Sequence, residues 1–358
     1  MNWGELITLE YGKPVKDKDS TDGKVPVYGT NGQIGTSHLP AQCKHPSFIL
    51  GRKGAYRGVH YSDCPFSVID TAFYAEPLTD RIDLKWAYYK FLTYDINGMD
   101  SGSAIPSTDR YQIYSIEVEV PPLEKQRKIV AVLDCIDRKI NINQKVNDNL
   151  EQQAAALFSG LYNRSNTEVG YTDLIQILGG GTPKTGETAY WNGNIAFFTP
   201  KDVGTPYTFI TEKTITEEGL SHCNSRLYPV NTVFVTARGT VGKVGLSGVP
   251  MAMNQSCYAL VGKETHQLLV YFYTLKAVDR LKHKASGAVF DAITTRDFDS
   301  EQIMKLSDDD AKAFLCVAEP MFQEILNNSI ENLQLSTLRD FLLPKLMSGE
   351  IDVSSVQL

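Results

Sequence analysis

An internal repeat constrains the fold of this chain more than any other feature of its sequence. The second half matches the first at a constant offset of 185 positions, which is the separation of Gly54 and Gly239. The same offset aligns Pro65 with Pro250, 71–73 with 256–258, and 101–103 with 286–288. Near the N-terminus the offset is shorter, so the second copy contains an insertion, which its composition places mainly between Gly186 and Ser225. Repetition over this length predicts two similar folded units in one chain.

The composition is that of a globular protein. With 358 residues, of which 42% are hydrophobic and 22% charged, the chain is long enough for two domains of ordinary size. No run of about eighteen apolar residues occurs, and we expect a soluble, cytoplasmic protein. The six cysteines form no C-x-x-C pair and are predicted to be free thiols. The net charge of −7 argues mildly against a protein that coats nucleic acid, but it says nothing about local basic surfaces.

Each copy is predicted to be a mixed α+β domain. In the first copy, Gly, Pro, Asn and Asp turns separate strand-like runs at 47–50, 67–74 and 115–120, and an apolar helix is expected near 84–92. The second copy repeats this scheme, with strands expected at 195–198, 232–236 and 256–261 and a helix near 267–281.

A heptad pattern follows each copy. After Pro121-Pro122, apolar or small residues recur at alternating spacings of four and three, which is typical of a coiled coil. They are Ile129, Leu133, Ile136, Ile140, Leu150, Ala154, Leu157 and Leu161. The corresponding helix would be about 57 Å long at 1.5 Å per residue. The second stripe comprises Ala318, Phe322, Leu326, Ile330, Leu333, Thr337 and Phe341, and we expect that helix to break at Leu343-Pro344.

The order of domain, helix, domain and helix predicts how these parts are arranged. The second helix can bury its stripe most simply by running back antiparallel along the first. We therefore expect two α+β domains separated by a two-helix coiled coil with approximate two-fold symmetry. The predicted boundaries are 1–121, 122–164, 165–307 and 308–358. Asn143 and Asn147 lie in the seam, where Asn usually fixes helix alignment. The alternative is that the stripes face other proteins.

Sequence motifs of catalysis are missing. There is no Asn-Pro-Pro-Tyr or Asp-Pro-Pro-Tyr segment of the amino-methyltransferase type, no G-x-G-x-x-G after a strand, and no Glu-x-Lys pair of the restriction-nuclease type. The segment 179–186 resembles a phosphate-binding loop, but Glu187 stands where such a loop needs Lys. The six histidines lack H-x-x-x-H and H-E-x-x-H spacings, so no metal site is expected. We predict a non-catalytic protein.

Cationic and amide side chains gather in glycine-rich turns, where glycine allows the backbone to approach a ligand closely. Arg and Lys can bind guanine edges, Asn and Gln can pair with adenine, and backbone amides can bind phosphates. Each cluster alone is weak evidence, because such charges usually only solvate a turn, and their recurrence in both copies weakens that interpretation somewhat. The candidate DNA-binding residues are Tyr28, Thr30, Asn31, Gln33, Arg52, Lys53 and Arg57 in the first copy, and Trp191, Lys201, Arg238, Lys243 and Arg296 in the second.

Several segments are similar to the specificity subunit of type I DNA restriction-modification systems. They are Pro-Pro-Leu-Glu-Lys-Gln at 121–126 leading to Asp-Arg-Lys-Ile at 137–140, and the tail Leu-Leu-Pro-Lys-Leu-Met-Ser-Gly-Glu-Ile at 342–351. Segments 25–32, 191–195 and 199–202 support them, and the resemblance covers essentially the whole chain. One departure is that Ser307-Asp308-Asp309-Asp310 stands where the family often repeats Pro-Pro-Leu, which leaves the start of the second helix open.

The resemblance implies that each domain is a target recognition domain for one half of a bipartite double-stranded DNA sequence, and that the helices set the gap between the halves. It also implies docking of two modification subunits, which carry S-adenosylmethionine and methylate adenine, and through them of a restriction subunit. S-adenosylmethionine, ATP and Mg would then belong to the partners, and this chain would need no cofactor. The expected partner-binding residues are Ile129, Leu133, Ile136, Ile140, Leu150, Leu157, Phe322, Ile330, Leu333 and Phe341.

Two other functions compete with this interpretation. The chain could be a bivalent scaffold whose domains bind protein or glycan, with the helices as a spacer. It could also be a self-sufficient DNA enzyme, which the missing cofactor and nuclease motifs disfavour. Salt-dependent DNA affinity separates the first alternative from DNA recognition.

Overall fold

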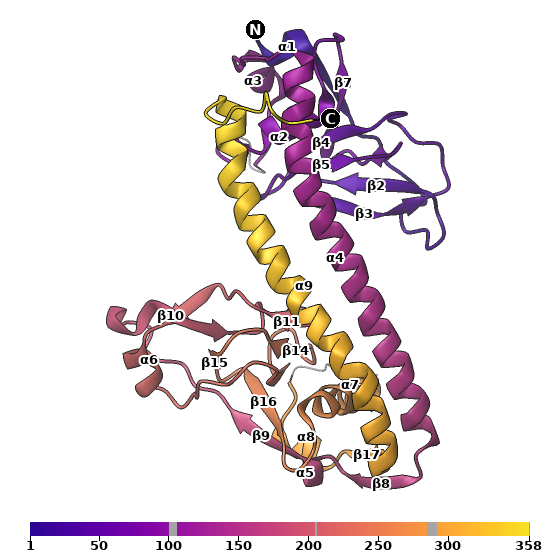
Figure 1. The fold of residues 1–358 in the computed structure, drawn as a ribbon, viewed down its shortest axis with the longest axis vertical. Coiled ribbons are helices and arrows are strands. Elements are labelled where there is room, and N and C mark those ends of the chain that lie inside the picture. The colour runs from indigo at the N-terminus through magenta and orange to yellow at the C-terminus, as the bar shows by residue number, and fades with distance from the viewer. Residues whose placement is uncertain (100–105, 205, 285–291, 358) are drawn as a thin grey trace. The chain divides into compact units, whose positions relative to one another are not determined.

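The computed structural model describes residues 1–99, 106–204, 206–284 and 292–357, and it divides into two units (Figure 1). Unit 1 comprises Met1–Ile140 and Leu333–Leu358, and unit 2 comprises Asn141–Asn332. Each unit therefore contains one copy of the repeat together with a segment of each long helix. The repeat segments 101–103 and 286–288 lie outside the described residues.

Unit 1 is built on a four-stranded antiparallel sheet with the order β1-β7-β4-β5. Its strands are β1 (Ile7–Tyr11), β4 (Ser47–Gly51), β5 (Val59–Ser62) and β7 (Ala72–Pro77). A smaller sheet has the order β3-β2-β6, formed by β2 (Val25–Gly29), β3 (Gly32–Ser37) and β6 (Ser67–Val68). The helices are α1 (Trp3–Leu6), α2 (Leu84–Phe91) and α3 (Arg110–Ser115). Helix α2 packs against β4 and β5, and Trp3, Phe48 and Trp86 are fully buried in this core.

Unit 2 contains a five-stranded sheet with the order β11-β14-β13-β16-β9, covered by α7 (Gln267–Lys284). Its strands are β9 (Ile175–Gly179), β11 (Tyr207–Thr208), β13 (Val233–Thr236), β14 (Val244–Ser247) and β16 (Cys257–Gly262). Smaller sheets are formed by β10 (Trp191–Phe198), β12 (Lys213–Ile215) and β15 (Met251–Met253), and by β8 (Thr167–Gly170) and β17 (Gln302–Lys305). The short helices are α5 (Tyr171–Leu174), η1 (Thr188–Tyr190), α6 (Glu217–Ser221) and α8 (Thr295–Asp299).

The strand pairings confirm the repeat and the α+β class. Ile49 pairs with Tyr74 between β4 and β7, and Phe234 pairs with Ala259 between β13 and β16, both at the offset of 185. The first strands β1 and β9 are related by a shorter offset of 168, from Ile7 to Ile175. The insertion of 17 positions between these offsets therefore lies between β9 and β13.

Two strand predictions in unit 1 need correction. Residues 115–120 do not form a strand, because α3 ends at Ser115 and the following segment makes only an isolated bridge between Glu117 and Asn2. Its carbonyls and amides bond to the chain start instead of to a sheet ladder, as in Trp3 N to Ile116 O. The run at 67–74 splits into two strands, β6 and β7. The chain turns between them, because the Ile69 amide donates a hydrogen bond to the Tyr28 carbonyl.

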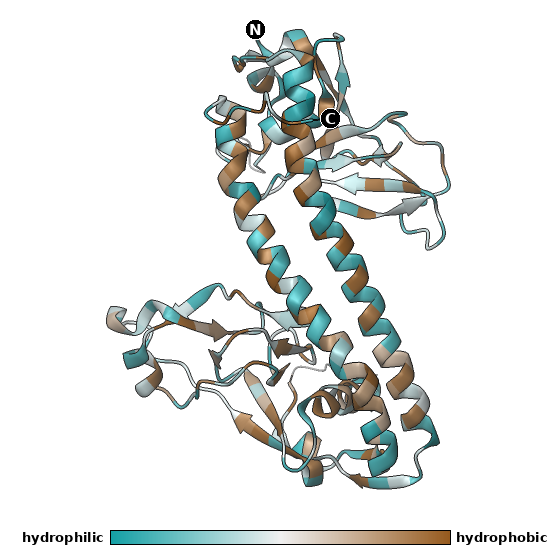
Figure 2. Cartoon of the chain, in the orientation of Figure 1, coloured by the Kyte–Doolittle hydropathy of each residue, from teal (hydrophilic) through white to brown (hydrophobic). Residues whose placement is uncertain are grey.

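The long helices are α4 (Leu123–Arg164) and α9 (Asp308–Ser348), of 42 and 41 residues, or about 63 and 62 Å. Figure 2 shows apolar and polar residues alternating along both. Helix α9 starts at three aspartates, where the Ser307 hydroxyl accepts from the Asp310 amide and negative charge is favourable. The predicted break at Pro344 is wrong. A proline removes one helical hydrogen bond, but burial of the flanking Leu343 and Leu346 holds the helix through it.

Segments of α4 and α9 pack against each other within each unit. In unit 2, Asn143 Nδ2 donates to Glu331 Oε2 at 2.7 Å, and farther along α4 the Phe158 ring lies 5.5 Å from that of Phe314, so these segments run antiparallel. In unit 1, Arg339 Nη1 donates to Asp137 Oδ1 at 3.1 Å. Among the residues described, none of the helices combines the length and hydrophobicity that crossing a lipid bilayer requires.

A buried glutamine joins the start of α4 to the domain of unit 1. Gln126 is fully buried, and its Nε2 donates to the carbonyls of Arg81 and Pro121, each at 2.8 Å. Its Oε1 accepts from the amide of Asp83 at 2.8 Å, and Asp83 in turn caps α2. All the amide groups of this side chain are therefore used to connect three segments.

Candidate nucleic-acid interface

Each unit carries a turn with the same backbone hydrogen bonds at the end of its central strand. The first turn (residues 51–58) follows β4, and the second turn (residues 236–243) follows β13. The Gly51 amide donates to the Gly58 carbonyl at 2.8 Å, and the Thr236 amide donates to the Lys243 carbonyl at 2.9 Å. These two bonds are related by the offset of 185, so the turns have a common construction.

The attachment of each turn to its unit is also repeated. The amides of residues 52 and 53 both donate to Thr71 O, and those of residues 237 and 238 both donate to Ser256 O. The Thr108 amide donates to the residue 52 carbonyl, as the Ile293 amide does to the residue 237 carbonyl. Lys53 and Arg238 therefore occupy equivalent exposed positions on equivalent backbones.

The backbone requires a glycine at one shared position of the two turns, and the second turn has a further positive-φ glycine at Gly242, with φ of +74°. Gly54 has φ of +126° and Gly239 has φ of +81°, a region that side chains with a Cβ disfavour. A Cβ at either position would meet only ordinary van der Waals neighbours, so the requirement is conformational. The shared glycine that revealed the repeat in the sequence thus keeps an exposed cation on a tightly turned backbone.

Aromatic rings position the cations beside the first turn. The guanidinium of Arg52 lies 4.8 Å from the centroid of the Tyr11 ring, and that of Arg110 also lies 4.8 Å from it. Arg52 Nη1 in addition donates to Asp70 O at 3.1 Å. Cation–π contacts of this kind restrain a side chain without removing its charge. The sequence pattern does not indicate Arg110, because its place beside Tyr11 depends on a contact between distant segments.

The β2–β3 hairpin is bonded to the first turn through Thr30. The Thr30 hydroxyl donates to Lys53 O at 2.8 Å, and the Thr30 carbonyl accepts from the Gly58 amide and from His60 Nε2. Burial lowers the pKa of His60, which favours the neutral ring with its proton on Nε2. Asn31 and Gln33 are exposed on this hairpin, and Gln33 Nε2 donates to Gly35 O at 3.2 Å. The hairpin that carries both residues is therefore bonded to the first turn through Thr30.

Two candidates of unit 1 are packing residues. Arg57 is only 2% exposed, and its Nη2 donates to the carbonyls of Ile96 and Asn97 at 3.2 and 2.7 Å. The prediction that Arg57 offers an exposed donor to DNA is wrong, because the guanidinium fixes the segment after α2. Tyr28 is half-buried, with its ring 5.7 Å from that of Phe66, and burial raises the pKa of its hydroxyl.

The second turn adjoins a loop that belongs to the insertion. The Thr240 hydroxyl donates to Pro200 O at 3.0 Å, and the turn and this loop line a hollow of about 430 Å³. Exposed Lys201 lies on its wall, 3.5 Å from Glu212. The structure thus brings Lys201 and the second turn together, although about forty positions separate them in the sequence.

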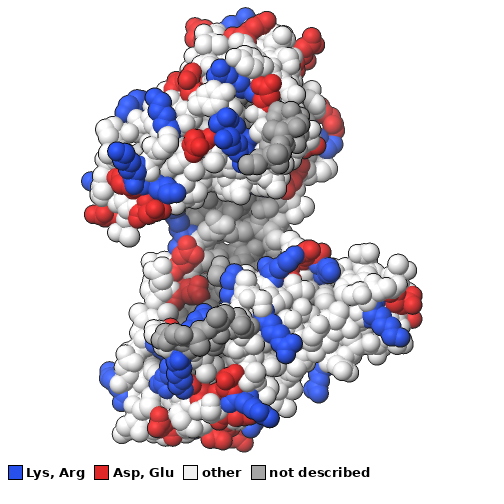
Figure 3. All heavy atoms as spheres, turned by 180° about the vertical axis from the view of Figure 1, so that it is seen from behind, with Lys and Arg blue, Asp and Glu red and all other residues white. Residues whose placement is uncertain are grey.

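The other candidates of unit 2 lie on neighbouring elements. Lys243 is exposed at the end of the second turn, and Arg296 is exposed on α8. The Trp191 indole donates to Lys184 O at 3.1 Å, and Lys213 Nζ lies 5.6 Å from its ring. Figure 3 shows Lys and Arg side chains gathered in groups on the visible face of each unit. A chain with net negative charge therefore still offers local cationic surface.

The helix residues divide into buried and exposed sets. Ile129, Leu133 and Phe322 are at most 3% exposed and pack into the cores of their own units, so their assignment to partner binding is wrong. Ile136 is 9% exposed and offers a partner little surface. Ile140, Leu150 and Leu333 are partly buried. Leu157, Ile330 and Phe341 are exposed at 36%, 39% and 60%. The sequence pattern missed the exposed apolar side chains of Ile142, Val146, Val317 and Leu338, because they lie outside the heptad stripe.

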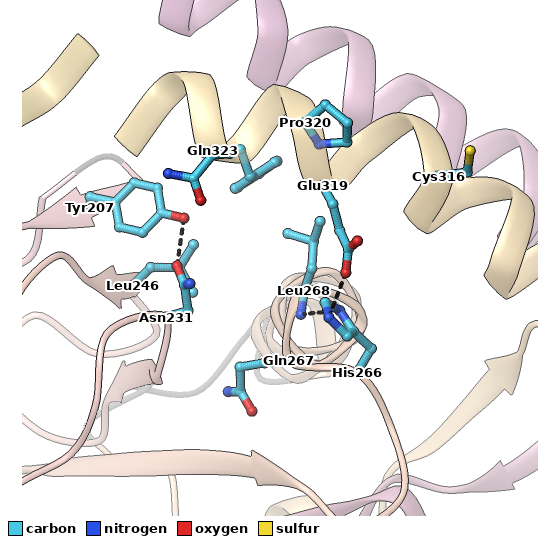
Figure 4. Close-up of a pocket in the computed structure, with 11 residues that line it drawn as sticks. Tyr207, Asn231, Leu246, His266, Gln267, Leu268, Cys316, Glu319, Pro320 and Gln323 are labelled. Atoms are coloured by element: carbon cyan, nitrogen blue, oxygen red, sulfur yellow. Dashed lines mark hydrogen bonds and ion pairs between the residues drawn. The ribbon is translucent and has the colours of Figure 1, made fainter. Parts of the chain in front are cut away.

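Unit 2 also contains a pocket of about 440 Å³ between the start of α7, the sheet and α9 (Figure 4). The Tyr207 hydroxyl donates to Asn231 Oδ1 at 2.7 Å, and His266 Nε2 lies 2.6 Å from Glu319 Oε1. Pro320 lies on the same wall of α9 and has no amide hydrogen to donate. Most of the polar groups drawn are bonded to one another. A ligand in this pocket would therefore be held by fit to its shape more than by hydrogen bonds from free donors.

Three potential metal ligands come together elsewhere in unit 1. The ligand atoms of Cys43, His45 and Glu76 all lie within 4.8 Å of one another. Histidine spacing does not reveal this cluster, because Glu76 lies 31 positions beyond His45. The closely spaced Cys-x-His at 43–45 was the signal that could have directed attention to this segment.

The family model and the relatives that match this chain all belong to one protein family. The type I restriction modification DNA specificity domain matches this chain twice, over residues 2–152 and 165–305. The type I restriction enzyme MjaIX specificity subunit of Methanocaldococcus jannaschii is 32% identical over 124 residues, which are 33% of this chain and 29% of that protein. The HindI specificity subunit of Haemophilus influenzae is 22% identical over 346 residues, and the match covers 74% of each chain.

A solved structure has a similar fold. The match to the crystal structure of a type I restriction-modification system S subunit from M. genitalium covers 97% of this chain and 95% of that subunit, with a TM-score of 0.61. The sequence identity is 16%, so the likeness concerns the fold.

Proposed function

This chain belongs to the type I restriction-modification DNA specificity family, and from that premise we propose that it recognises a bipartite DNA target for a modification complex. Unit 1 reads one half of the target and unit 2 reads the other. The chain itself supplies recognition, and catalysis resides in two modification subunits and, through them, a restriction subunit. S-adenosylmethionine, ATP and Mg would be bound by those partners.

The observation that carries the proposal is the duplicated turn. Lys53 and Arg238 are exposed on turns that share the backbone hydrogen bonds anchoring them to their units, and a cation at such a position can bind a guanine edge or a phosphate. The surroundings differ, since the Thr30 hairpin adjoins the first turn and the 199–202 loop adjoins the second. Two similarly anchored turns with different neighbouring loops are suited to two domains that read different bases.

The helices are proposed to act as a spacer and as the docking surface. The exposed apolar side chains of Leu157, Ile330 and Phe341 have no place in a core of the described residues, and burial against a partner would remove them from water. With two similar docking stretches, a pseudo-symmetric helix pair would accept two identical modification subunits. The resulting complex would be cytoplasmic, where chromosomal DNA is accessible.

The test is to reconstitute the chain with the modification subunits of its host and to map methylated adenines on genomic DNA. Lys53→Ala should relax or weaken one half of the methylated sequence, and Arg238→Ala should affect the other half, each by about 1–3 kcal/mol of discrimination if a base edge is contacted. Lys312→Ala, at an exposed position at the start of α9, is the matched control and should leave both halves unchanged.

Three outcomes would contradict the proposal. Equal weakening of both halves by either substitution would mean general phosphate binding. A complex without salt-dependent DNA affinity would favour the scaffold for protein or glycan. Methyl transfer or DNA cleavage by the purified chain without partners would make it an enzyme.

A further inference from the structure

The Cys43, His45 and Glu76 side chains are held by rigid parts of unit 1. Cys43 is fully buried, and its amide and carbonyl bond to Phe66 in both directions at 3.0 and 3.1 Å. Glu76 lies on β7, which pairs with both β1 and β4. The three side chains therefore approach one another from two fixed segments, which is the preorganisation that a metal site requires.

The orientation of His45 directs one ring nitrogen to the other two groups. His45 Nδ1 lies 3.0 Å from the Pro46 carbonyl, which can only accept, so Nδ1 carries a proton. His45 Nε2 lies 2.7 Å from Glu76 Oε2 and 3.9 Å from Cys43 Sγ. A carbonyl bound to the distal nitrogen is the usual arrangement of a metal-binding histidine, because it fixes the tautomer and ring direction.

We propose that Cys43 Sγ, His45 Nε2 and one carboxylate oxygen of Glu76 bind a zinc ion. Zinc takes sulfur at about 2.3 Å and nitrogen or oxygen at about 2.0–2.2 Å in tetrahedral geometry, which places ligand atoms roughly 3.2–3.6 Å apart. The observed separations of 2.7 and 3.9 Å lie on either side of this range, so small side-chain rotations suffice. The thiolate favours zinc over magnesium or calcium.

The fourth coordination position is left for water. The side chains of His45 and Glu76 are 37% and 34% exposed, so the ion can enter from solvent while Cys43 holds it from inside. Binding releases to solvent both the thiol proton of Cys43 and the proton shared between His45 Nε2 and Glu76 Oε2, while Nδ1 keeps its own. The ion would fasten the segment before β4 to β7, beside the core cluster that contains Phe66 and contacts Tyr28.

The experiment uses the full chain after removal of metal with a chelator. Zinc is titrated in competition with a chromophoric chelator, and cobalt is used as a spectroscopic probe. We expect one zinc per chain and a thiolate-to-cobalt charge-transfer band. Cys43→Ser and His45→Gln should weaken binding by more than about 100-fold, because changes in outer-shell residues alone cost roughly 10- to 100-fold.

The matched control is Cys257→Ser, which removes the other fully buried cysteine and should leave zinc binding unchanged. Circular dichroism checks that each variant is folded. Wild-type chain that binds no stoichiometric zinc, or cobalt binding without a thiolate band, would overturn the proposal even if the variants fail to fold. Equal binding by folded Cys43→Ser would overturn it as well.

Discussion

The first and second turns share the backbone hydrogen bonds that anchor them, but their inner sides are stabilised differently. At the position of Arg57 in unit 1, the offset of 185 places Gly242 in unit 2. Arg57 fills its space and bonds to carbonyls after α2, whereas a Cβ on Gly242 would meet Lys282 Cε of α7 at 2.6 Å. In unit 2 the longer α7 thus occupies the room that an arginine occupies in unit 1. The exposed positions of Lys53 and Arg238 are alike although Gly242 has φ of +74° where the first turn has Arg57, so two different interiors support them.

The largest effect should come from Arg57. Arg57→Ala removes a buried charged side chain and leaves the carbonyls of Ile96 and Asn97 without this donor, so unit 1 should lose about 3–5 kcal/mol of its free energy of unfolding. Urea denaturation measures this loss. Lys53→Ala, at an exposed neighbour, should change stability by less than about 0.5 kcal/mol. If Arg57→Ala kept normal stability but no longer recognised one half of the DNA target, Arg57 would be a DNA-contact residue and not a packing residue.

Alanine at Gly54 and at Gly239 tests whether the two backbones are equivalent at this position. Gly54→Ala and Gly239→Ala should each lose about 1–3 kcal/mol, because both positions have positive φ and no steric obstacle. The loss should be larger at Gly54, whose φ of +126° lies farther from the left-handed helical region. Thermal unfolding provides the comparison.

The control for this pair is Gly160→Ala on α4, where a Cβ meets nothing within 4 Å. Because alanine is the better helix former, this change should stabilise the chain by up to about 1 kcal/mol. A neutral effect at Gly54 would mean that the first turn can adopt another backbone, and the two turns would then not be equivalent.

The helix contacts also differ between units. In unit 2, Asn328 Nδ2 donates to Asn147 Oδ1 at 2.9 Å with both residues buried, whereas in unit 1 the contact of Arg339 with Asp137 is partly exposed. Asn328→Ala should cost about 1–3 kcal/mol, since it leaves Asn147 poorly satisfied. Arg339→Ala should cost about 1 kcal/mol or less.

Replacing both Asn147 and Asn328 by Leu sharpens this prediction. The double variant should recover most of the stability in urea denaturation, because no buried polar group is left unpaired. Its oligomeric state, measured by light scattering, should become less uniform if the Asn pair fixes helix alignment. A double variant less stable than Asn328→Ala would contradict this account.

The smallest effect should be the pH dependence that His60 gives to unit 1. The pKa of His60 is lowered by burial, so the contribution of the neutral ring is complete above the unfolded value of about 6.5 and is lost as pH falls through the folded pKa. Unit 2 has Gly245 at the corresponding position. Between pH 7 and 5, wild type should lose more stability in urea than His60→Gln. Equal losses would show that His60 does not contribute.

The sequence predicted those parts of the fold that depend on periodicity. The offset of 185, the two long helices and the exposed turn cations Lys53 and Arg238 follow from local pattern and from repetition. The pattern could not tell that Arg57 turns inward, because its partners are carbonyls about forty positions away. It also could not distinguish heptad residues that enter a domain core from those left for a partner, since both sets are apolar.

The same limit applies to the metal ligands and to Pro344. Glu76 meets His45 only because β7 lies beside β4 in the sheet. Pro344 looks like a helix end to local rules, but burial of Leu346 against unit 1 outweighs the lost hydrogen bond. Both errors arise where long-range packing decides the outcome.

The bonding of Gln126 has a consequence for protein engineering. Its partners are main-chain atoms of Arg81, Asp83 and Pro121, so a foreign domain needs only the same backbone path to be received by α4. Grafts joined just before Pro121 should therefore keep the direction in which the helix leaves the domain. The Gln126 amide can connect α4 to any domain with this backbone path, so the chain can acquire a new DNA specificity while its long helices are retained.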